Sequence, residues 1–512
     1  MVQDNPKPMF SRESFFKFII IYLQLTQVTM LSLGLFYVMD KSWVSSFANG
    51  NVIISSLLIF QFVWIILSWR WCSQQDYLNL YIIFILACFT FNASHCVLHL
   101  FGLLDEGILD NRFSDVSIIQ SLYFVLVSFS WLHLGALVGY VNSPRKRERI
   151  GYIHLTYSSV RFVSILLIAL ALPFWLYKYY HILQIVIRGG YFAIYQVDKP
   201  TGFATIDTVL SGFLVPAALF LLATSRDSRV LRWLAIVILL SEILANLFIG
   251  GRGGAAMDTI ALLWVWHRSI KKIPVGLVFI LGVCALTIFP LIFALRNIPG
   301  AERLNFGVWI TTLGYVDNPL VASIKEMGGS LQTLVYTLEL VPTARPFAYG
   351  GTYFWAMTTL LPNFFWDVHP AASAIAAKWL VQTVDPTFAA KGGGYGYSIF
   401  AEGYLNFGWL GSILPMFIMG FLISKLLRWE SLRFHPAKVG MVASFFSLFI
   451  WIARAESISV VRQLFWYSLF PLLLMVLCDE VFRVVFKESK RYATFGDIAV
   501  VKQPNGQRGA KE

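Results

Sequence analysis

The chain has 512 residues, of which 57% are hydrophobic, 16% aromatic and only 13% charged. So few polar side chains cannot cover a water-soluble core of this size, which excludes an ordinary soluble protein and makes the bilayer the solvent. The net charge of +12 does not require nucleic acid, because its distribution follows the rule that cytoplasmic loops of membrane proteins retain lysine and arginine.

Apolar runs of about 20 residues, long enough to cross a bilayer, recur along the chain. They predict an all-α polytopic membrane protein with about 12 transmembrane helices. The runs lie at 15–38, 50–69, 77–102, 117–141, 162–184, 205–224, 231–250, 254–268, 273–294, 398–427, 438–455 and 463–486. The first run is too long for a signal-peptide core, so we expect it to remain as the first helix.

Basic residues cluster in every second loop between these runs, at Arg145–Arg149, Arg226–Arg232, Arg268–Lys272, Lys425–Lys438 and Arg483–Arg491. Such clusters mark the cytoplasmic side of a membrane protein. We therefore expect both termini to be cytoplasmic and the intervening loops to face the opposite, outer side.

Four regions follow from these spans. We expect nine transmembrane helices in 1–294, a large outer loop in 295–397, helices ten to twelve in 398–486 and a disordered cytoplasmic tail in 487–512. A loop of about a hundred residues is far longer than a simple connection, so it is expected to be structured and functional. Its stretch from Ala371 to Val384 has the spacing of an amphipathic helix that lies against the membrane.

Arginines gather where predicted helices reach the outer side. Arg252 stands within the sequence GGRGG before the predicted eighth helix, where a tight turn and a helix N-terminus would favour a bound anion. Arginine matches phosphate with a planar, permanently charged fork. The residues expected to bind a diphosphate are Arg252, Arg296, Arg303, Arg454 and Arg462. The alternatives are contacts with lipid headgroups, a plain hairpin turn at Arg252, and an ion pair of Arg454 or Arg462 with Glu456.

The sequence KGGGYGYSIFAEGYLNFG, residues 391–408, carries a glycine run into the predicted tenth helix. A carboxylate, a phenol and an amide just inside a membrane helix are costly unless they face protein or ligand. Glu402 is therefore a candidate catalytic base, and Tyr397, Tyr404 and Asn406 are candidates for binding glycan hydroxyls. The alternative is a capping and packing motif that holds the long loop to the bundle.

Two further groups could take part in acid–base chemistry. Asp367 and His369 form the one close pair of acid and imidazole in the outer loops, and they are candidate catalytic residues, although such pairs are often only solvated. Glu242 and Asp258 fall within predicted spans, where they could balance Arg252 or serve a proton-coupled transporter. The five cysteines have no spacing that would hold zinc, and no Asp-x-Asp pair occurs outside, so we expect no metal and no cofactor.

Several of these features together resemble the O-antigen polysaccharide polymerase (Wzy) family. They are the glycine-rich turn with Arg252, the long outer loop, the glycine-rich stretch into Glu402–Gly408, and the segment Arg454–Arg462 followed by Trp466 and Tyr467. The resemblance extends over residues 250–474, while the N-terminal half matches only as a run of helices.

This resemblance implies a bacterial inner-membrane glycosyltransferase of the GT-C-like kind. Such an enzyme transfers a glycan carried on undecaprenyl diphosphate to a lipid-linked repeat unit at the periplasmic face, without a metal. It implies membrane lipid, an undecaprenyl-diphosphate-linked oligosaccharide and a chain-length regulator protein as partners. Preorganised arginines would stabilise the diphosphate leaving group as its charge develops.

Two alternatives remain open at this point. An O-antigen ligase, or another lipid-linked glycosyltransferase, would share the outer arginines. A flippase or secondary transporter would instead need charged residues along a path through the bundle, of which the sequence offers only Glu242 and Asp258.

Overall fold

The structure is a computed structural model that describes residues 12–47, 49–73, 78–141, 156–196, 206–296, 298, 302, 305–314, 318–360, 369–430 and 436–496. Every regular element within these ranges is a helix, which confirms the predicted all-α class.

Within the described residues, nine helical segments are long and apolar enough to cross a membrane, so the chain is a multi-pass membrane protein. They are α1 (Arg12–Val38), α3 (Gly50–Ser73), α4 (Leu80–Leu100), α5 (Asp115–Val141), α6 (Tyr157–Gly189), the pair α8 (Ile206–Ser211) and α9 (Leu214–Ala223), α10 (Arg229–Ile249), α12 (Val275–Leu295), and α22 (Pro436–Phe449) with the 3-10 helix η6 (Ile450–Arg454).

The predicted number of twelve spans is not confirmed by the described residues. The predicted tenth span is a pair bent by 97°, in which α20 (Ile399–Phe407) and η5 (Gly408–Ser412) precede α21 (Leu414–Glu430), and it would raise the number to ten. The predicted eighth is α11 (Arg252–Val265), whose 14 residues extend through a π turn, η3 (Trp266–Ile270). The predicted twelfth is divided among α23 (Ser457–Leu464), a π turn, η7 (Phe465–Leu469), and α24 (Phe470–Gly496).

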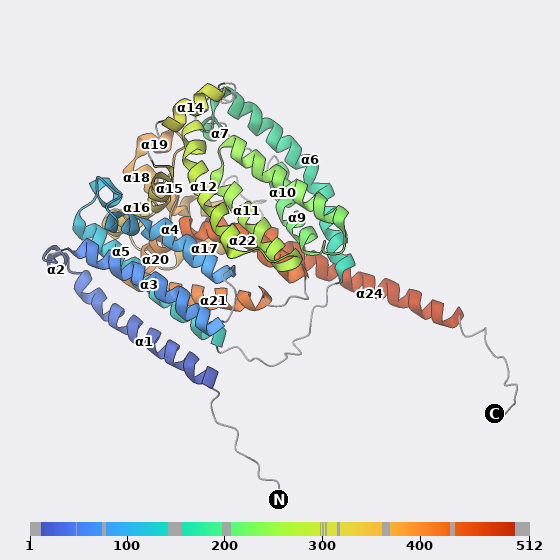
Figure 1. The fold of residues 1–512 in the computed structure, drawn as a ribbon, viewed down its shortest axis with the longest axis horizontal. Coiled ribbons are helices and arrows are strands. Elements are labelled where there is room, and N and C mark those ends of the chain that lie inside the picture. Colours follow the sequence, from blue (N-terminus) through green and yellow to red (C-terminus); the bar gives the residue numbers. More distant parts are fainter. Residues whose placement is uncertain are drawn as a thin grey trace, which may run out of the picture.

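The helix ends are arranged on two opposite sides of the bundle. The start of α1 and the end of α24 lie on one side, whereas α2 (Lys41–Ser45), α7 (Ala193–Gln196) and α14 (Phe306–Gly314) lie on the other (Figure 1). The start of α1 and the end of α24 thus lie on the same side of the bundle, and the compartment that this side faces stays a prediction. We refer to the side of α2, α7 and α14 as the outer side.

Helices α5 and α21 pack with their backbones close together. A side chain at Gly420 would collide with the carbonyl oxygen of Leu132, and one at Gly135 with that of Phe417. Small residues let two backbones approach in this way, and such contacts drive helix association in a bilayer, where the hydrophobic effect between helices is absent.

The outer segment between α12 and α20 is built of short helices. They are α14, α15 (Pro319–Gly328), α16 (Leu331–Leu340), α17 (Gly351–Thr358), the 3-10 helix η4 (Pro370–Ala374), α18 (Ala376–Val384) and α19 (Pro386–Ala390). Helix α15 packs against α4 and α12, and α16 packs against α5 and α20. His95 of α4 holds α15 in place, since its Nε2 donates to the carbonyl oxygen of Lys325 at 2.8 Å.

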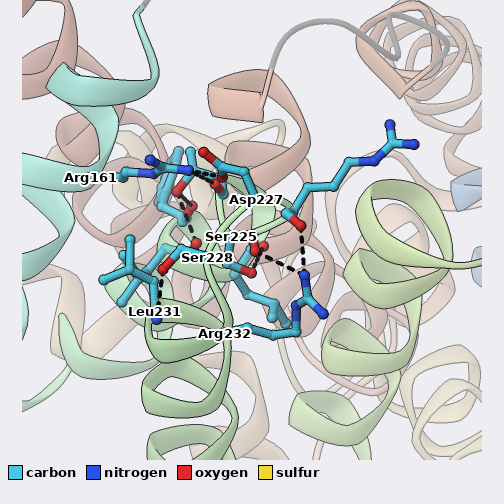
Figure 2. Close-up of polar contacts among 11 residues, drawn as sticks. Arg161, Ser225, Asp227, Ser228, Leu231 and Arg232 are labelled. Carbon is cyan, nitrogen blue, oxygen red and sulfur yellow. Dashed lines mark hydrogen bonds and ion pairs between the residues drawn. The ribbon is translucent and has the colours of Figure 1, made fainter.

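Two arginines close the turn between α9 and α10 on the opposite, predicted cytoplasmic side (Figure 2). Arg161 of α6 pairs with Asp227 and donates to the carbonyl oxygen of Thr224 at 2.5 Å. Arg232 of α10 donates to the carbonyl oxygen of Arg226 at 2.7 Å. The last carbonyls of a helix have no partner within it, so arginines that reach them stabilise the helix end.

Candidate functional site

The glycine-rich turn between α10 and α11 brings two of the predicted arginines together. Gly250 ends α10 in the left-handed conformation with φ of 102°. A Cβ at this position would lie 2.7 Å from the Cβ of Arg296, so only glycine permits the approach. Arg252 is the first residue of α11, and its backbone belongs to the positive end of that helix.

Arg252 forms a two-pronged ion pair with Glu326 of α15. Its Nη1 donates to Oε2 of Glu326 at 2.7 Å, and its Nη2 donates to Oε1. Nη1 also donates to the carbonyl oxygen of Phe289 at 3.1 Å. The guanidinium is thus fixed by the end of α15 and by α12, while the exposed fractions of the two side chains, 13% and 30%, leave the pair in reach of a ligand.

Arg296 follows α12 and lies against aromatic rings. The centre of its guanidinium is 4.2 Å from the ring centroid of Phe293 and 4.9 Å from that of Tyr191. Burial and the neighbouring charge of Arg252 both lower the pKa of Arg296, so the two guanidinium groups lie close enough to repel each other.

Arg454 ends η6 on the same side. Its guanidinium lies 5.9 Å from the ring centroid of Phe91, and it interacts electrostatically with Arg252 and Glu326. Its carbonyl oxygen accepts a hydrogen bond of 3.1 Å from the N–H of Tyr397, at the end of the glycine run.

We call Arg252, Arg296, Arg454 and Glu326 the outer arginine cluster. Its four members carry three positive charges and one negative charge. Helix ends from α11, α12, η6 and α15 position the four side chains. A group with two phosphates would match both the charge and the forked donors.

The other two predicted arginines are not placed in this cluster. Arg462 is exposed on α23 and has Tyr467 as an electrostatic neighbour. Arg303 lies outside the described residues.

Glu402 has donors on both of its oxygens. It is 1% exposed, and Oε1 accepts from the hydroxyls of Thr352 at 2.7 Å and Ser457 at 2.5 Å. Oε2 accepts from the backbone N–H of Ser457 at 2.8 Å. The carboxylate therefore caps the N-terminus of α23 and ties it to α17 and α20, an arrangement that holds elements together.

Glu456 caps a second helix in the same way. Its oxygens accept from the N–H groups of Ala376 at 2.6 Å and Ala377 at 3.1 Å, the first two residues of α18. Burial, together with the nearby carboxylate of Glu402, raises the pKa of Glu456 to about 7. The suggested ion pair of Glu456 with Arg454 or Arg462 is replaced by this cap.

The predicted glycan-binding residues lie in the packed interior. Tyr397 is fully buried, and its hydroxyl is 3.0 Å from that of Thr337. Asn406 is also fully buried, and it donates to the hydroxyl of Thr352 at 2.7 Å. Tyr404 is 6% exposed, with its ring edge-on to Trp409. These contacts account for the three side chains by packing.

His369 caps η4, because its Nδ1 accepts from the N–H of Ala371 at 3.1 Å. Its predicted partner Asp367 lies outside the described residues. Glu242 does not balance Arg252, since its carboxylate accepts from Trp175, from Tyr179 at 2.7 Å and from Asn246 at 3.0 Å.

Sequence reasoning misses Glu326, which belongs to no motif. Its position follows from the docking of α15 between α4 and α12, and such a tertiary contact leaves no periodic signal in the chain. The one available hint is that acidic residues are scarce in the outer segment, so each of them is a candidate partner for an outer arginine.

Comparison with known proteins assigns the chain to a family. The model of the family described as O-antigen polysaccharide polymerase Wzy matches residues 11–484. No curated protein and no solved structure matches the chain significantly.

Proposed function

The chain belongs to the O-antigen polysaccharide polymerase Wzy family, and from this premise we propose that it extends a surface polysaccharide at the periplasmic face of the bacterial inner membrane. The donor is a glycan linked to undecaprenyl diphosphate, and the acceptor is a lipid-linked repeat unit. A hydroxyl of the acceptor attacks the anomeric carbon of the donor, the bond to the diphosphate breaks, and undecaprenyl diphosphate leaves.

The outer arginine cluster is the observation that supports this reaction best. Negative charge builds on the diphosphate as the glycosidic bond breaks, and fixed cations stabilise charge where it develops. Helix ends and aromatic rings hold Arg252, Arg296 and Arg454 in place before the donor binds.

Glu326 is the ion-pair partner of Arg252 in the structure. A diphosphate that binds Arg252 takes the place of this carboxylate, because both use the same guanidinium donors. Binding therefore replaces the carboxylate of Glu326 at Arg252 with a diphosphate, which carries more negative charge.

The acceptor hydroxyl loses a proton in this reaction. We assign its removal to the predicted pair Asp367 and His369, because the carboxylate of Glu402 is inaccessible and has donors on both oxygens. Glu402 then acts as a positioning residue, which keeps the N-terminus of α23 beside α17 and α20.

The test is the glycan length on lipid carrier and cell surface in a deletion strain complemented at equal protein level. We expect wild type to restore long chains, and Arg252→Ala and Arg454→Ala to leave single repeat units. Arg188→Ala is the matched control, since Arg188 is exposed at the outer end of α6, and it should behave as wild type. Long chains that persist in the deletion strain would refute the proposal.

The same experiment separates the alternatives. A ligase predicts that unligated long chains accumulate on the lipid carrier after deletion. A flippase or transporter predicts that the repeat units remain on the cytoplasmic face. A chain-length regulator, if it associates, would change the distribution of lengths while polymerisation continues.

A further inference from the structure

Four aromatic side chains from distant parts of the sequence form a continuous set on the outer side. They are Phe113, Tyr336, Phe388 and Tyr395, which we call the aromatic surface. The ring centroids are 4.7 Å apart for Phe113 and Tyr336, 6.4 Å for Tyr336 and Tyr395, and 5.6 Å for Phe388 and Tyr395. All four are only partly buried, so part of each ring remains accessible.

The glycine run joins the aromatic surface to the outer arginine cluster. Tyr395 is followed by Gly396, where a Cβ would lie 3.0 Å from the carbonyl oxygen of Arg454 and 3.5 Å from its Cγ. Gly396 has φ of 74°, so a larger residue there would be strained as well as crowded. The aromatic rings therefore begin one residue away from the predicted diphosphate site.

The other end of the glycine run meets a tyrosine next to the cluster. A Cβ at Gly392 would lie 2.6 Å from the Cβ of Tyr195. The hydroxyl of Tyr195 is 2.8 Å from that of Tyr191, whose ring lies against Arg296. Residues 392–396 thus lie between Arg454 and the tyrosines around Arg296.

The middle of this run is open. A Cβ at Gly394 would meet no atom within 4 Å, and Gly394 does not have a positive φ. Neither packing nor backbone conformation requires glycine there. Space above a bare backbone, between charged and aromatic groups, is a place where a ligand can approach closely.

Polar groups accompany the rings. Asp385 accepts from the N–H of Phe388 at 2.9 Å and from the hydroxyl of Tyr395 at 3.1 Å. The hydrogen bond from Phe388 is the largest of the effects that lower the pKa of Asp385, so it is an ionised acceptor near the rings. Sugars combine flat apolar faces with hydroxyl donors, and they need aromatic faces beside fixed acceptors.

We propose that the aromatic surface and the glycine run bind the glycan of the lipid-linked substrate, with the sugar nearest the diphosphate over Gly394 and the next sugars against Tyr395 and Tyr336. This inference rests on the proposed function and reassigns glycan binding from the buried residues Tyr397, Tyr404 and Asn406 to partly exposed residues of the same outer segment.

The test measures two ligands on the purified full chain in lipid nanodiscs. One probe is undecaprenyl diphosphate. The other is the oligosaccharide released by mild acid from the lipid-linked repeat units that accumulate in a deletion strain. Tyr395→Ala should weaken oligosaccharide binding about tenfold, Tyr395→Phe should retain most of it, and both should bind undecaprenyl diphosphate as wild type does.

Gly394→Leu keeps the test independent of folding defects, because its side chain enters open space. We expect it to weaken oligosaccharide binding to at least the same extent. The matched control is Gly314→Leu, since a Cβ at Gly314 in α14 also meets nothing within 4 Å, and this variant should bind both probes normally.

The two proposals fail in different ways. Oligosaccharide binding that is absent from wild type, or unchanged in Tyr395→Ala and Gly394→Leu, would overturn the glycan surface. Even if the glycan surface is overturned, loss of undecaprenyl diphosphate binding in Arg454→Ala would support the outer arginine cluster as the diphosphate site. Absence of undecaprenyl diphosphate binding from wild type would count against the proposed function itself.

Discussion

Individual charged residues explain more of the candidate site than any single motif does. Arg252 has a fixed carboxylate partner, Arg296 has aromatic neighbours, and Arg454 is tied through its backbone to Tyr397. A buried or half-buried charge is stable only when paired or hydrogen-bonded, so the ion pair of Arg252 with Glu326 shows which contact a ligand must replace.

We expect Glu326→Gln to tighten the binding of undecaprenyl diphosphate by about tenfold. The variant removes the anion that competes for Arg252, and a hydrogen bond to a charged group contributes about 1.5–3 kcal/mol. Titration of the purified protein in nanodiscs measures this affinity. Glu339→Gln is the control, because Glu339 is exposed on α16. An unchanged or weaker affinity in Glu326→Gln would rule out the competition.

Glu456 should make stability depend on pH. Its pKa of about 7 is above the ordinary value of 4.5, so its stabilising contribution is complete below about pH 4.5 and is lost as the pH rises through 7. We expect the melting temperature of wild type to fall relative to that of Glu456→Gln between pH 5 and pH 8. If the melting temperatures of the two proteins change with pH in the same way, ionisation of Glu456 does not destabilise the fold.

The sequence indicated which residues are unusual, but not which neighbours they contact in the fold. Arginines at helix ends could be predicted because topology places such ends at one depth, and the structure does bring Arg252, Arg296 and Arg454 together. Glu402 and Tyr397 looked functional because polar groups in a membrane helix are costly, yet packing satisfies both. Hydrophobic periodicity and motif spacing do not indicate which residue will pair with a buried polar group. Glu326 therefore could not be predicted from them as the partner of Arg252.

At the scale of helices, close backbone contact replaces side-chain interdigitation in the pair α5 and α21. The carbonyl oxygens of Leu132 and Phe417 occupy the space that side chains at Gly420 and Gly135 would need. The backbones also approach closely where Gly403 of α20 faces Gly411 of η5, because a side chain at either position would collide with the other residue. The bend between α20 and α21 therefore depends on glycines as much as on the 3-10 turn itself.

Gly420→Ala should destabilise the bundle by about 1–3 kcal/mol, because the added methyl group collides with a rigid carbonyl. A thermal melt of the purified protein in detergent would show this as a lower midpoint. Gly282→Ala is the matched control, since a Cβ at Gly282 in α12 meets nothing within 4 Å. Equal midpoints for the two variants would mean that α5 and α21 can separate without cost.

For the whole molecule, the order of helices was predictable from apolar length, and the described residues confirm the all-α, multi-pass class. The number of spans was less predictable, because the predicted tenth is bent and the predicted eighth and twelfth include π turns. An apolar run gives length and hydropathy, whereas a bend or a broken helix depends on the partners that satisfy its backbone.

Topology can be tested with single cysteines in a background whose five native cysteines are replaced by alanine. We expect a membrane-impermeant maleimide to label Gly314→Cys in intact spheroplasts, and to label Arg226→Cys only after permeabilisation. Both variants should label fully in detergent, which controls for local reactivity. Labelling of Arg226→Cys in intact spheroplasts would place the α9–α10 turn outside and reverse the predicted orientation.

The open backbone at Gly394 has a consequence for how product size is determined. A groove with a closed end would limit the length of the product, because the glycan could grow only until it filled the groove. The partly exposed rings beside Gly394 would, on the proposed assignment, hold a few sugars and leave the rest of the chain free in the periplasm. On the proposed assignment, this protein contacts a short and a long glycan equally, so the final length is set by the competition between another transfer and release of the chain, a kinetic property that a second protein could adjust.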